Sequence, residues 1–218
     1  MHSSAVRRDR RRSGWSTGLR PRLPDYPVRA SDMPGFRHLS DEVVHQGYVW
    51  RVVVGRFEAP DGDVFTRDVV RSPGAVAVVP IRMDADGHPW VTLVRQYRAP
   101  LDEHVVEIPA GMRDVEGEPA ESTAQRELGE EVGLVAGRLE LLTRFSPSVG
   151  MTDAELFVYL ALELETSERD VHGPEESHMD VVELPLAHAV QMVVDGEIHD
   201  AKTIIGLLLA ERRLGVAT

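Results

Sequence analysis

The chain of 218 residues contains no cysteine, so disulfide bonds and thiolate metal sites are both excluded. It has no apolar run close to the roughly 20 residues that a membrane-spanning helix needs, and we expect a cytoplasmic location by default. Lysine is scarce, and Lys202 is the single lysine among the 24 lysine and arginine residues. With a formal net charge of -12, the chain body lacks the clustered basic face that neutralises phosphates, so no nucleic-acid partner is expected.

The N-terminus differs in charge from the rest of the chain, since five arginines fall between Arg7 and Arg12. The segment up to about Met33 mixes Arg, Ser, Gly and Pro without apolar periodicity, which is typical of a disordered tail. A targeting segment would need an apolar stretch behind the basic residues, and none is present. We therefore divide the chain into a disordered tail at 1–35, a β-hairpin region at 36–72 and a main domain at 73–214.

The order of apolar runs and turns predicts a mixed sheet with helices packed on its faces. A Pro-Asp-Gly turn between β-branched and aromatic runs predicts a hairpin within 47–71. Glu118 and Pro119 are expected to start a helix, with the carboxylate as cap, that ends at Gly133. The other expected elements are strands at 75–81, 90–96, 139–144 and 156–164, a strand before the turn at 109–111, and helices at 186–194 and 201–214.

The first expected helix carries three glutamates within the stretch QRELGEEVGL, residues 125–134. Each helical residue turns about 100°, so Glu127 and Glu131 project from one face with Glu130 beside them. Exposed like charges at this spacing destabilise a helix by roughly a few tenths of a kcal/mol per pair. Such a face is either simply solvated, or it binds a hard divalent cation that prefers oxygen ligands. The helix alone leaves both interpretations open.

The residues around this helix resemble a known motif. The stretch GMRDVEGEPAESTAQRELGEEVGL closely resembles the Nudix box, a glycine and a glutamate followed by R-E-U-x-E-E-x-G-U with U aliphatic. Six residues separate Gly111 from Glu118 here, one more than in the family pattern, and the extra residue falls in a loop before the helix. The matching positions are Glu118, Arg126, Glu127, Leu128, Glu130, Glu131, Gly133 and Leu134.

This resemblance implies a Nudix fold, which is an α/β/α sandwich around a mixed β-sheet. It implies hydrolysis of a nucleoside diphosphate linked to another moiety X, with Mg²⁺ as the cofactor and Mn²⁺ as a substitute. Such a cation neutralises the phosphate oxygens and lowers the pKa of the attacking water. The motif assigns metal ligation by position to the carbonyl of Ala110 and to Glu127, Glu130 and Glu131.

The same resemblance implies roles for the remaining residues of the box. Glu130 is a further ligand or the catalytic base, and Arg126 orients the glutamates through bidentate contacts. Gly111 is expected to contact the substrate. Glu118 corresponds to an outer-shell residue.

Outside the box, the chain resembles the ADP-ribose pyrophosphatase group of the family over about residues 40–214. The resemblance lies in the N-terminal hairpin and in the stretches LVRQYRAPLDEHVVEIPAG, GMTDAELFVYLALEL and DGEIHDAKTIIGLLLAE. It implies cleavage of ADP-ribose to AMP and a sugar phosphate by a homodimer in which the N-terminal strands form a small extra sheet. Trp50 and Tyr48 are the candidates for stacking on adenine, and Arg98 corresponds to a phosphate-contacting arginine. The alternatives are packing aromatic residues and an exposed strand arginine.

Two departures affect the substrate and the base. Val149 occupies the position where ADP-ribose-specific members have a proline, and Ala154 occupies the position of a loop glutamate that is a candidate base. Glu155 is one residue late, and a shift by one along a strand moves a side chain to the opposite face. The open alternatives are Glu155 after a one-residue slip of the loop, Asp153, or a more distant residue such as Glu175 or Glu176.

Two other functions compete with this hypothesis. One is a Nudix hydrolase whose substrate carries a different X. The other is a Nudix-like ligand sensor without catalysis, which is expected to have lost the metal-ligating glutamates. Since Glu127, Glu130 and Glu131 are all present, the sequence favours an enzyme.

Overall fold

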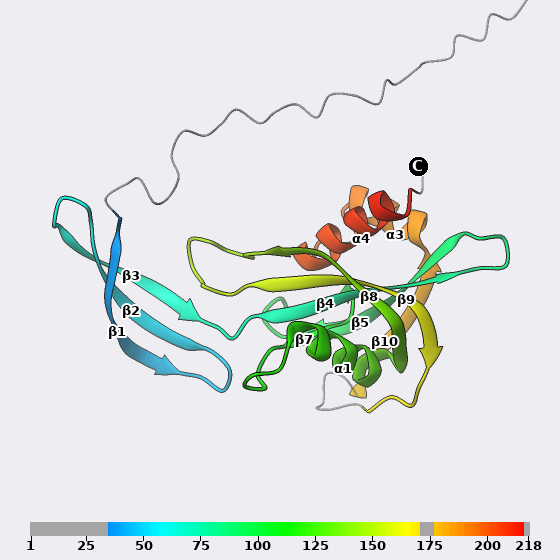
Figure 1. The fold of residues 1–218 in the computed structure, drawn as a ribbon, viewed down its shortest axis with the longest axis horizontal. Helices are drawn as coiled ribbons and strands as arrows, with labels where there is room; N and C mark the ends of the chain where they lie inside the picture. The colour runs from blue at the N-terminus through cyan, green and yellow to red at the C-terminus, as the bar shows by residue number, and fades with distance from the viewer. Residues whose placement is uncertain (1–34, 171–176, 216–218) are drawn as a thin grey trace, which may run out of the picture.

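The computed structural model describes residues 35–170 and 177–215, which contain two β-sheets and the helices α1, α3 and α4 (Figure 1). A small sheet of three strands projects from one end of the molecule. The larger sheet has seven strands, with α1 on one face and α3 and α4 on the other. This arrangement confirms the predicted α/β/α sandwich. The prediction of a disordered tail concerns residues that lie outside the described ranges.

The small sheet, which we call the N-terminal sheet, consists of β1 (Arg37–Gln46), β2 (Arg51–Glu58) and β3 (Val64–Arg71) in that order. The antiparallel pair β2–β3 is the predicted hairpin, and its turn contains Gly62 at a φ of 91°. The sequence did not predict β1 as a strand. Its sequence, RHLSDEVVHQ, does not alternate between apolar and polar residues, and all ten residues are exposed.

The larger sheet has the order β10-β5-β4-β9-β8, with β6 paired to β5 and β7 paired to β4. β4 and β9 run parallel, and the other pairs are antiparallel. Neither β7 nor β10 was predicted, because a three-residue strand and a largely exposed edge strand carry little pattern. The bounds are β4 Ala75–Met83, β5 Pro89–Arg98, β6 Glu103–Glu107, β7 Ala110–Met112, β8 Leu134–Phe145, β9 Leu156–Thr166 and β10 Asp180–Pro185.

Strand β4 supplies side chains to two cores, because successive strand residues point to opposite faces of a sheet. Ala77, Val79 and Ile81 are buried in the core beneath α3 and α4. Val76 and Val78 are buried in the core on the α1 side. The nearly continuous apolar run of this strand is therefore explained by burial on both faces.

The three helices span the predicted ranges closely, with α1 at Ala120–Val132, α3 at Leu186–Val194 and α4 at Ala201–Leu214. Gly133 ends α1 in the left-handed conformation, with a φ of 65°, as predicted. The prediction that Glu118 caps α1 is wrong, because the helix begins one residue later with Pro119 as its N-cap residue. The Glu118 carboxylate instead accepts a hydrogen bond of 2.8 Å from the Thr123 hydroxyl. No helix in the described ranges is long and apolar enough to cross a membrane.

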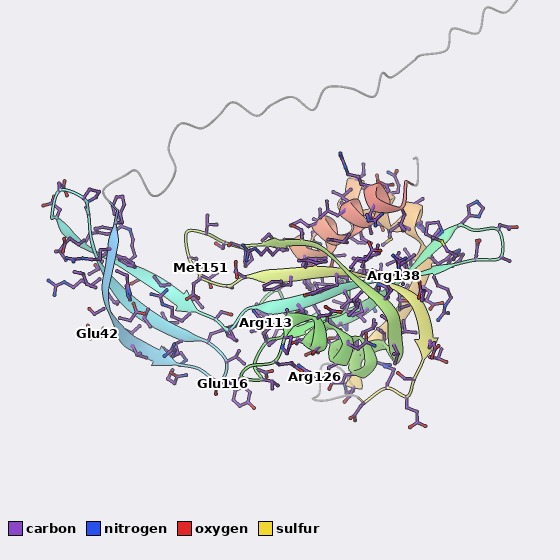
Figure 2. The ribbon with its side chains drawn as sticks, viewed as in Figure 1. Glu42, Arg113, Glu116, Arg126, Arg138 and Met151 are labelled. Carbon is purple, nitrogen blue, oxygen red and sulfur yellow. The ribbon has the colours of Figure 1, made fainter. Side chains whose placement is uncertain are left out.

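The N-terminal sheet is attached to the main body by the loop 146–155, which connects β8 to β9. The Val70 amide donates to the Met151 carbonyl at 2.9 Å, and the Thr152 hydroxyl donates to the Val70 carbonyl at 2.8 Å. Asp153 accepts a hydrogen bond of 3.0 Å from the Ser72 amide. Figure 2 shows Met151 at this junction, between the N-terminal sheet and the larger sheet.

Candidate active site

The glutamates of α1 line a cleft of about 590 Å³. Glu127 and Glu131 lie one helical turn apart and are only 8% and 4% exposed. Glu130 lines the same cleft and is partly exposed. Burial to this degree excludes a simply solvated acidic face as the explanation for Glu127 and Glu131.

Strand β7 packs directly against these glutamates. The Ala110 amide donates a hydrogen bond of 2.9 Å to Glu131 Oε2. A Cβ atom added to Gly111 would lie 1.9 Å from Glu127 Cδ, which is far inside van der Waals contact. Glycine at this position therefore lets the strand backbone approach the carboxylate without displacing it. Gly111 also lines the cleft, and its predicted contact with the substrate stays a prediction.

Arg126 connects the carboxylates around the cleft, and Figure 2 shows it beside α1. Its Nη1 atom lies 2.8 Å from Glu127 Oε1 and 2.9 Å from Glu130 Oε2, while Nη2 lies 3.5 Å from Glu118 Oε2. Burial opposes the charge on Arg126, but attraction by Glu127 and the other carboxylates outweighs it and raises the pKa. Arg126 is thus always a cation that fixes the positions of its neighbours, which is the geometry its predicted role requires.

Arg98 lies at the end of β5 and lines the same cleft. Its Nε and Nη2 atoms donate to the two oxygens of Glu107, at 2.5 Å and 2.7 Å. Glu107 also forms an ion pair with Lys202 of α4. Sequence reasoning missed both Glu107 and Lys202. The available signals were a charged residue within the apolar strand VVEI and the single lysine of the chain.

The two aromatic candidates differ in their position relative to the carboxylates. Trp50 is 54% exposed and lines the cleft together with Arg98 and the glutamates. Tyr48 is fully exposed and lines a neighbouring cleft of about 620 Å³, which also contains Arg113 and Asp114. Asp114 lines both clefts, so they adjoin each other. The structure brings Trp50, but not Tyr48, to the carboxylates.

The structure places Glu155 away from the carboxylates. Its carboxylate lies 3.8 Å from Arg144 Nη1, and Glu155 is not among the residues that line the cleft. Its neighbours Ala154 and Leu156 line a separate cavity of about 300 Å³ beside Trp50. This alternation is the one expected when a side chain moves by one position along a strand.

The three other candidates for the base have different outcomes. Asp153 accepts a hydrogen bond from the Ser72 amide and forms an ion pair with Arg71 at 3.2 Å, so its carboxylate attaches the N-terminal sheet. Glu175 and Glu176 lie outside the described residues.

A second acidic group, formed by Asp84, Asp86 and His88, lies in the turn between β4 and β5. All three residues are exposed. Asp84 Oδ1 accepts hydrogen bonds from the amides of Asp86 and His88, at 2.9 Å and 2.8 Å. Such bonds stabilise a turn without any ion.

The residues of the main cleft fit a hard divalent cation. Glu127, Glu130 and Glu131 provide oxygen donors only, which is the donor set that Mg²⁺ prefers and Mn²⁺ accepts. The backbone of Ala110 and Gly111 closes one side of this donor set. The Glu127 carboxylate is held by its ion pair with Arg126 and lies close to the backbone at Gly111, and a metal site requires such order in its ligands.

Known proteins resemble the chain over most of its length. A model of the NUDIX domain matches residues 72–204. The ADP-ribose pyrophosphatase of Mycobacterium tuberculosis is 38% identical over 173 residues, which cover 79% of this chain and 82% of that protein. The ADP-ribose pyrophosphatase of Bacillus subtilis is 37% identical over 165 residues, which cover 76% of this chain and 86% of that protein.

Two further comparisons show similarity of sequence and of fold. A methanol dehydrogenase activator of Bacillus methanolicus is 36% identical over 169 residues, which cover 78% of this chain and 89% of that protein. A crystal structure of an ADP compounds hydrolase superposes with a TM-score of 0.70 and covers 83% of this chain and 94% of that chain. Its sequence is 24% identical, so this likeness supports the fold alone.

Proposed function

This chain belongs to the Nudix family of hydrolases, and we propose that it cleaves the pyrophosphate bond of ADP-ribose or a related nucleotide sugar into AMP and a sugar phosphate. The observation that carries the proposal is that carboxylates, an arginine and an aromatic ring line one cleft. Buried Glu127 and Glu131 lie there with Arg98 and Trp50. Carboxylates for a cation, an arginine for phosphate and an aromatic ring for a base are the groups that a nucleoside diphosphate requires.

The cation in this proposal is Mg²⁺, with Mn²⁺ as a substitute. Glu127, Glu130 and Glu131 would hold it through carboxylate oxygens, and Ala110 through its carbonyl. When bound, the cation neutralises phosphate oxygens and lowers the pKa of a water molecule. Arg126 keeps Glu127 and Glu130 in place through its ion pairs with both.

The other residues of the cleft bind and orient the substrate in this proposal. Arg98 takes a phosphate oxygen, because its planar guanidinium matches the geometry of phosphate. Trp50, which is 54% exposed, offers its ring to the adenine. Tyr48 lies on the adjoining cleft, so a contact with the base in the same subunit is not part of this arrangement.

We further propose that the chain forms a homodimer through the N-terminal sheet. This sheet projects from the body (Figure 1), and several of the large apolar side chains on it are exposed. Exposed apolar side chains gathered on one small sheet mark a surface that binds a partner. The exposed residues on the sheet and its turns include Phe36, Leu39, Val43, Val44, Tyr48, Trp50 and Val64. The cytoplasmic location and the absence of a nucleic-acid partner stay predictions.

The test is a product assay over a panel of nucleotide sugars with Mg²⁺, using wild-type enzyme and the variants Glu127→Gln and Glu131→Gln. Each variant should lower turnover by orders of magnitude, because an amide oxygen is a poorer ligand than a carboxylate. Glu121→Gln is the matched control, since Glu121 is exposed on the first turn of the same helix and should tolerate the change. Turnover within threefold of wild type in both metal-site variants would contradict the proposal. Preference for another sugar in the panel would replace ADP-ribose by that substrate.

A further inference from the structure

Arg98 has charged neighbours within the protein that a contact with phosphate alone does not explain. Glu107, at the end of β6, is only 2% exposed, although it carries a carboxylate. In the β5–β6 ladder, Arg98 is paired with Glu103 and Val94 is paired with Glu107. The Arg98 side chain therefore reaches back along the ladder, past three intervening pairs of residues, to meet Glu107.

A second cation contacts the same carboxylate from another element. Lys202, in the first turn of α4, forms ion pairs with Glu107 and, at 3.0 Å, with Asp200. Asp200 is the N-cap residue of α4 and accepts a hydrogen bond of 3.0 Å from the Thr203 amide. The four charges of Arg98, Glu107, Lys202 and Asp200 sum to zero, so the buried carboxylate is fully compensated.

For the charge on Glu107, the pairing with Arg98 and Lys202 outweighs the unfavourable effect of burial. Burial by itself would raise the pKa of Glu107, but the hydrogen bonds from Arg98 and the attraction of Lys202 hold that pKa below its ordinary value. Glu107 is therefore ionised and paired in the folded protein. A buried charge of this kind is retained where its partners are fixed.

The pair also determines which edge of the arginine is available. Glu107 takes the edge that carries Nε and Nη2 of Arg98. Within residues 35–170 and 177–215, no hydrogen bond uses Nη1. The guanidinium is thus fixed on one edge and keeps N–H donors for a ligand in the cleft that it lines.

We propose that Glu107 is a positioning residue, which orients Arg98 for the diphosphate, and that Lys202 compensates the second half of its buried charge. This inference rests on the proposed function, because it assigns Arg98 to the phosphate groups of the substrate. A flexible arginine would lose side-chain entropy when it binds phosphate, and Glu107 removes that cost before the substrate arrives. Glu107 touches neither substrate nor cation in this scheme.

The experiment is a double-mutant cycle with ADP-ribose as substrate. Glu107→Gln keeps the shape but removes the charge, so it should raise KM by about tenfold or more with a smaller effect on kcat, as expected for a lost binding contact. Arg98→Ala should show a similar or larger effect. In the Arg98→Ala background, Glu107→Gln should change kcat/KM by less than about twofold, because the group through which it acts is absent.

The matched control is Glu103→Gln, which removes a carboxylate from the same strand. Glu103 is half exposed and pairs with His199 at 3.1 Å, although it is the residue opposite Arg98 in the ladder. Its KM should stay within about twofold of wild type. Melting temperatures of all variants separate a loss of folding from a loss of positioning.

A second measurement needs neither turnover nor the Glu107 variant. In ¹⁵N NMR spectra of the free protein, the Arg98 Nε–H, assigned by its loss in Arg98→Lys, should exchange slowly with solvent because it donates to a buried carboxylate. A rapidly exchanging Arg98 Nε–H would overturn the positioning role, as would additive effects of the two changes on kcat/KM. Absence of turnover of every nucleotide sugar in the panel by the wild-type protein would overturn the proposed function instead, and the NMR result would still decide the arrangement of Arg98.

Discussion

The contact between Gly111 and Glu127 makes a single methyl group a sensitive probe of the site. In Gly111→Ala, the new Cβ would lie 1.9 Å from Glu127 Cδ and 2.1 Å and 2.2 Å from its oxygens. Non-bonded carbon atoms pack at about 3.5 Å or more. The carboxylate, or the strand that carries the methyl group, therefore has to move by roughly 1.6 Å.

This displacement predicts a large loss of activity and a modest loss of stability. A misplacement of about 1 Å at a catalytic centre costs on the order of a hundredfold in rate, so kcat should fall by at least that factor. Overpacking typically costs about 1–3 kcal/mol. For a chain of this size, each kcal/mol lowers the melting temperature by roughly 2–4 °C, so the variant should remain folded at 25 °C.

Gly129→Ala is the matched control, because it makes the same change in α1 between Glu127 and Glu130. A Cβ at Gly129 would meet its nearest neighbour, the Leu134 carbonyl oxygen, at 3.9 Å, which is an ordinary contact. Replacing a helical glycine should stabilise the protein by about 0.5–1 kcal/mol. Its kcat should stay close to that of the wild-type enzyme.

The assays are steady-state kinetics with ADP-ribose, calorimetric titration with Mn²⁺ and thermal unfolding. Gly111→Ala should lose Mn²⁺ affinity together with kcat, whereas Gly129→Ala should keep both. If Gly111→Ala retained kcat within threefold of wild type, the carboxylate of Glu127 would not need its observed position. Equal losses in both variants would show that the effect arises from the helix and not from the contact.

Three further predictions concern the base, pH and assembly. Glu155→Gln should lower kcat by less than about fivefold and Glu130→Gln by about a hundredfold or more, and the reverse order in steady-state kinetics would contradict the placement of Glu155. Because the folded pKa of Glu107 is depressed, its contribution to stability is complete above the unfolded pKa of about 4.3 and is lost as pH falls through the folded value. The difference in unfolding free energy between wild type and Glu107→Gln, measured with urea, should therefore be constant from pH 6 to 8 and shrink below about pH 4.3. The wild-type chain should sediment as a dimer at micromolar concentration, and a monomer would contradict the proposed role of the N-terminal sheet.

Helix α1 was predictable because its apolar periodicity and its C-terminal glycine both indicate a helix over the same residues. The apolar side chains of Ala124, Leu128 and Val132 recur every four residues, and all three are buried as that spacing predicts. Gly133 then ends the helix in the left-handed conformation, which favours glycine. Where periodicity and end signals agree, local sequence is sufficient.

The partners of Arg98 were not predictable for the opposite reason. Arg98 and Glu107 lie nine positions apart in a β-ladder, and Lys202 lies 95 positions beyond Glu107 on another element. No spacing rule connects residues that meet only because α4 covers this face of the sheet. The charged residue within the strand VVEI was an available signal for a special site, but its partners are determined by tertiary packing.

The contacts of the loop that follows β8 explain why Glu155 does not occupy the position of Ala154. A shift by one residue, which would bring Glu155 to the place of Ala154, has to break the bonds that attach this loop to β3 and β4. These bonds include Val70 N to Met151 O at 2.9 Å and Ala75 N to Glu155 O at 3.0 Å. Each is worth about 1 kcal/mol net, and leaving a buried donor unpaired costs more.

The slip has a second cost, because Ala154 is 7% exposed and faces the cavity beside Trp50. A glutamate there would exchange its exposed pair with Arg144 for burial among apolar neighbours. The observed register is therefore favoured on both counts. Glu130 already lies in the cleft beside Arg126, which favours a catalytic base from the Nudix box itself. The variants of Glu130 and Glu155 therefore decide between a base in the box and a base in the loop.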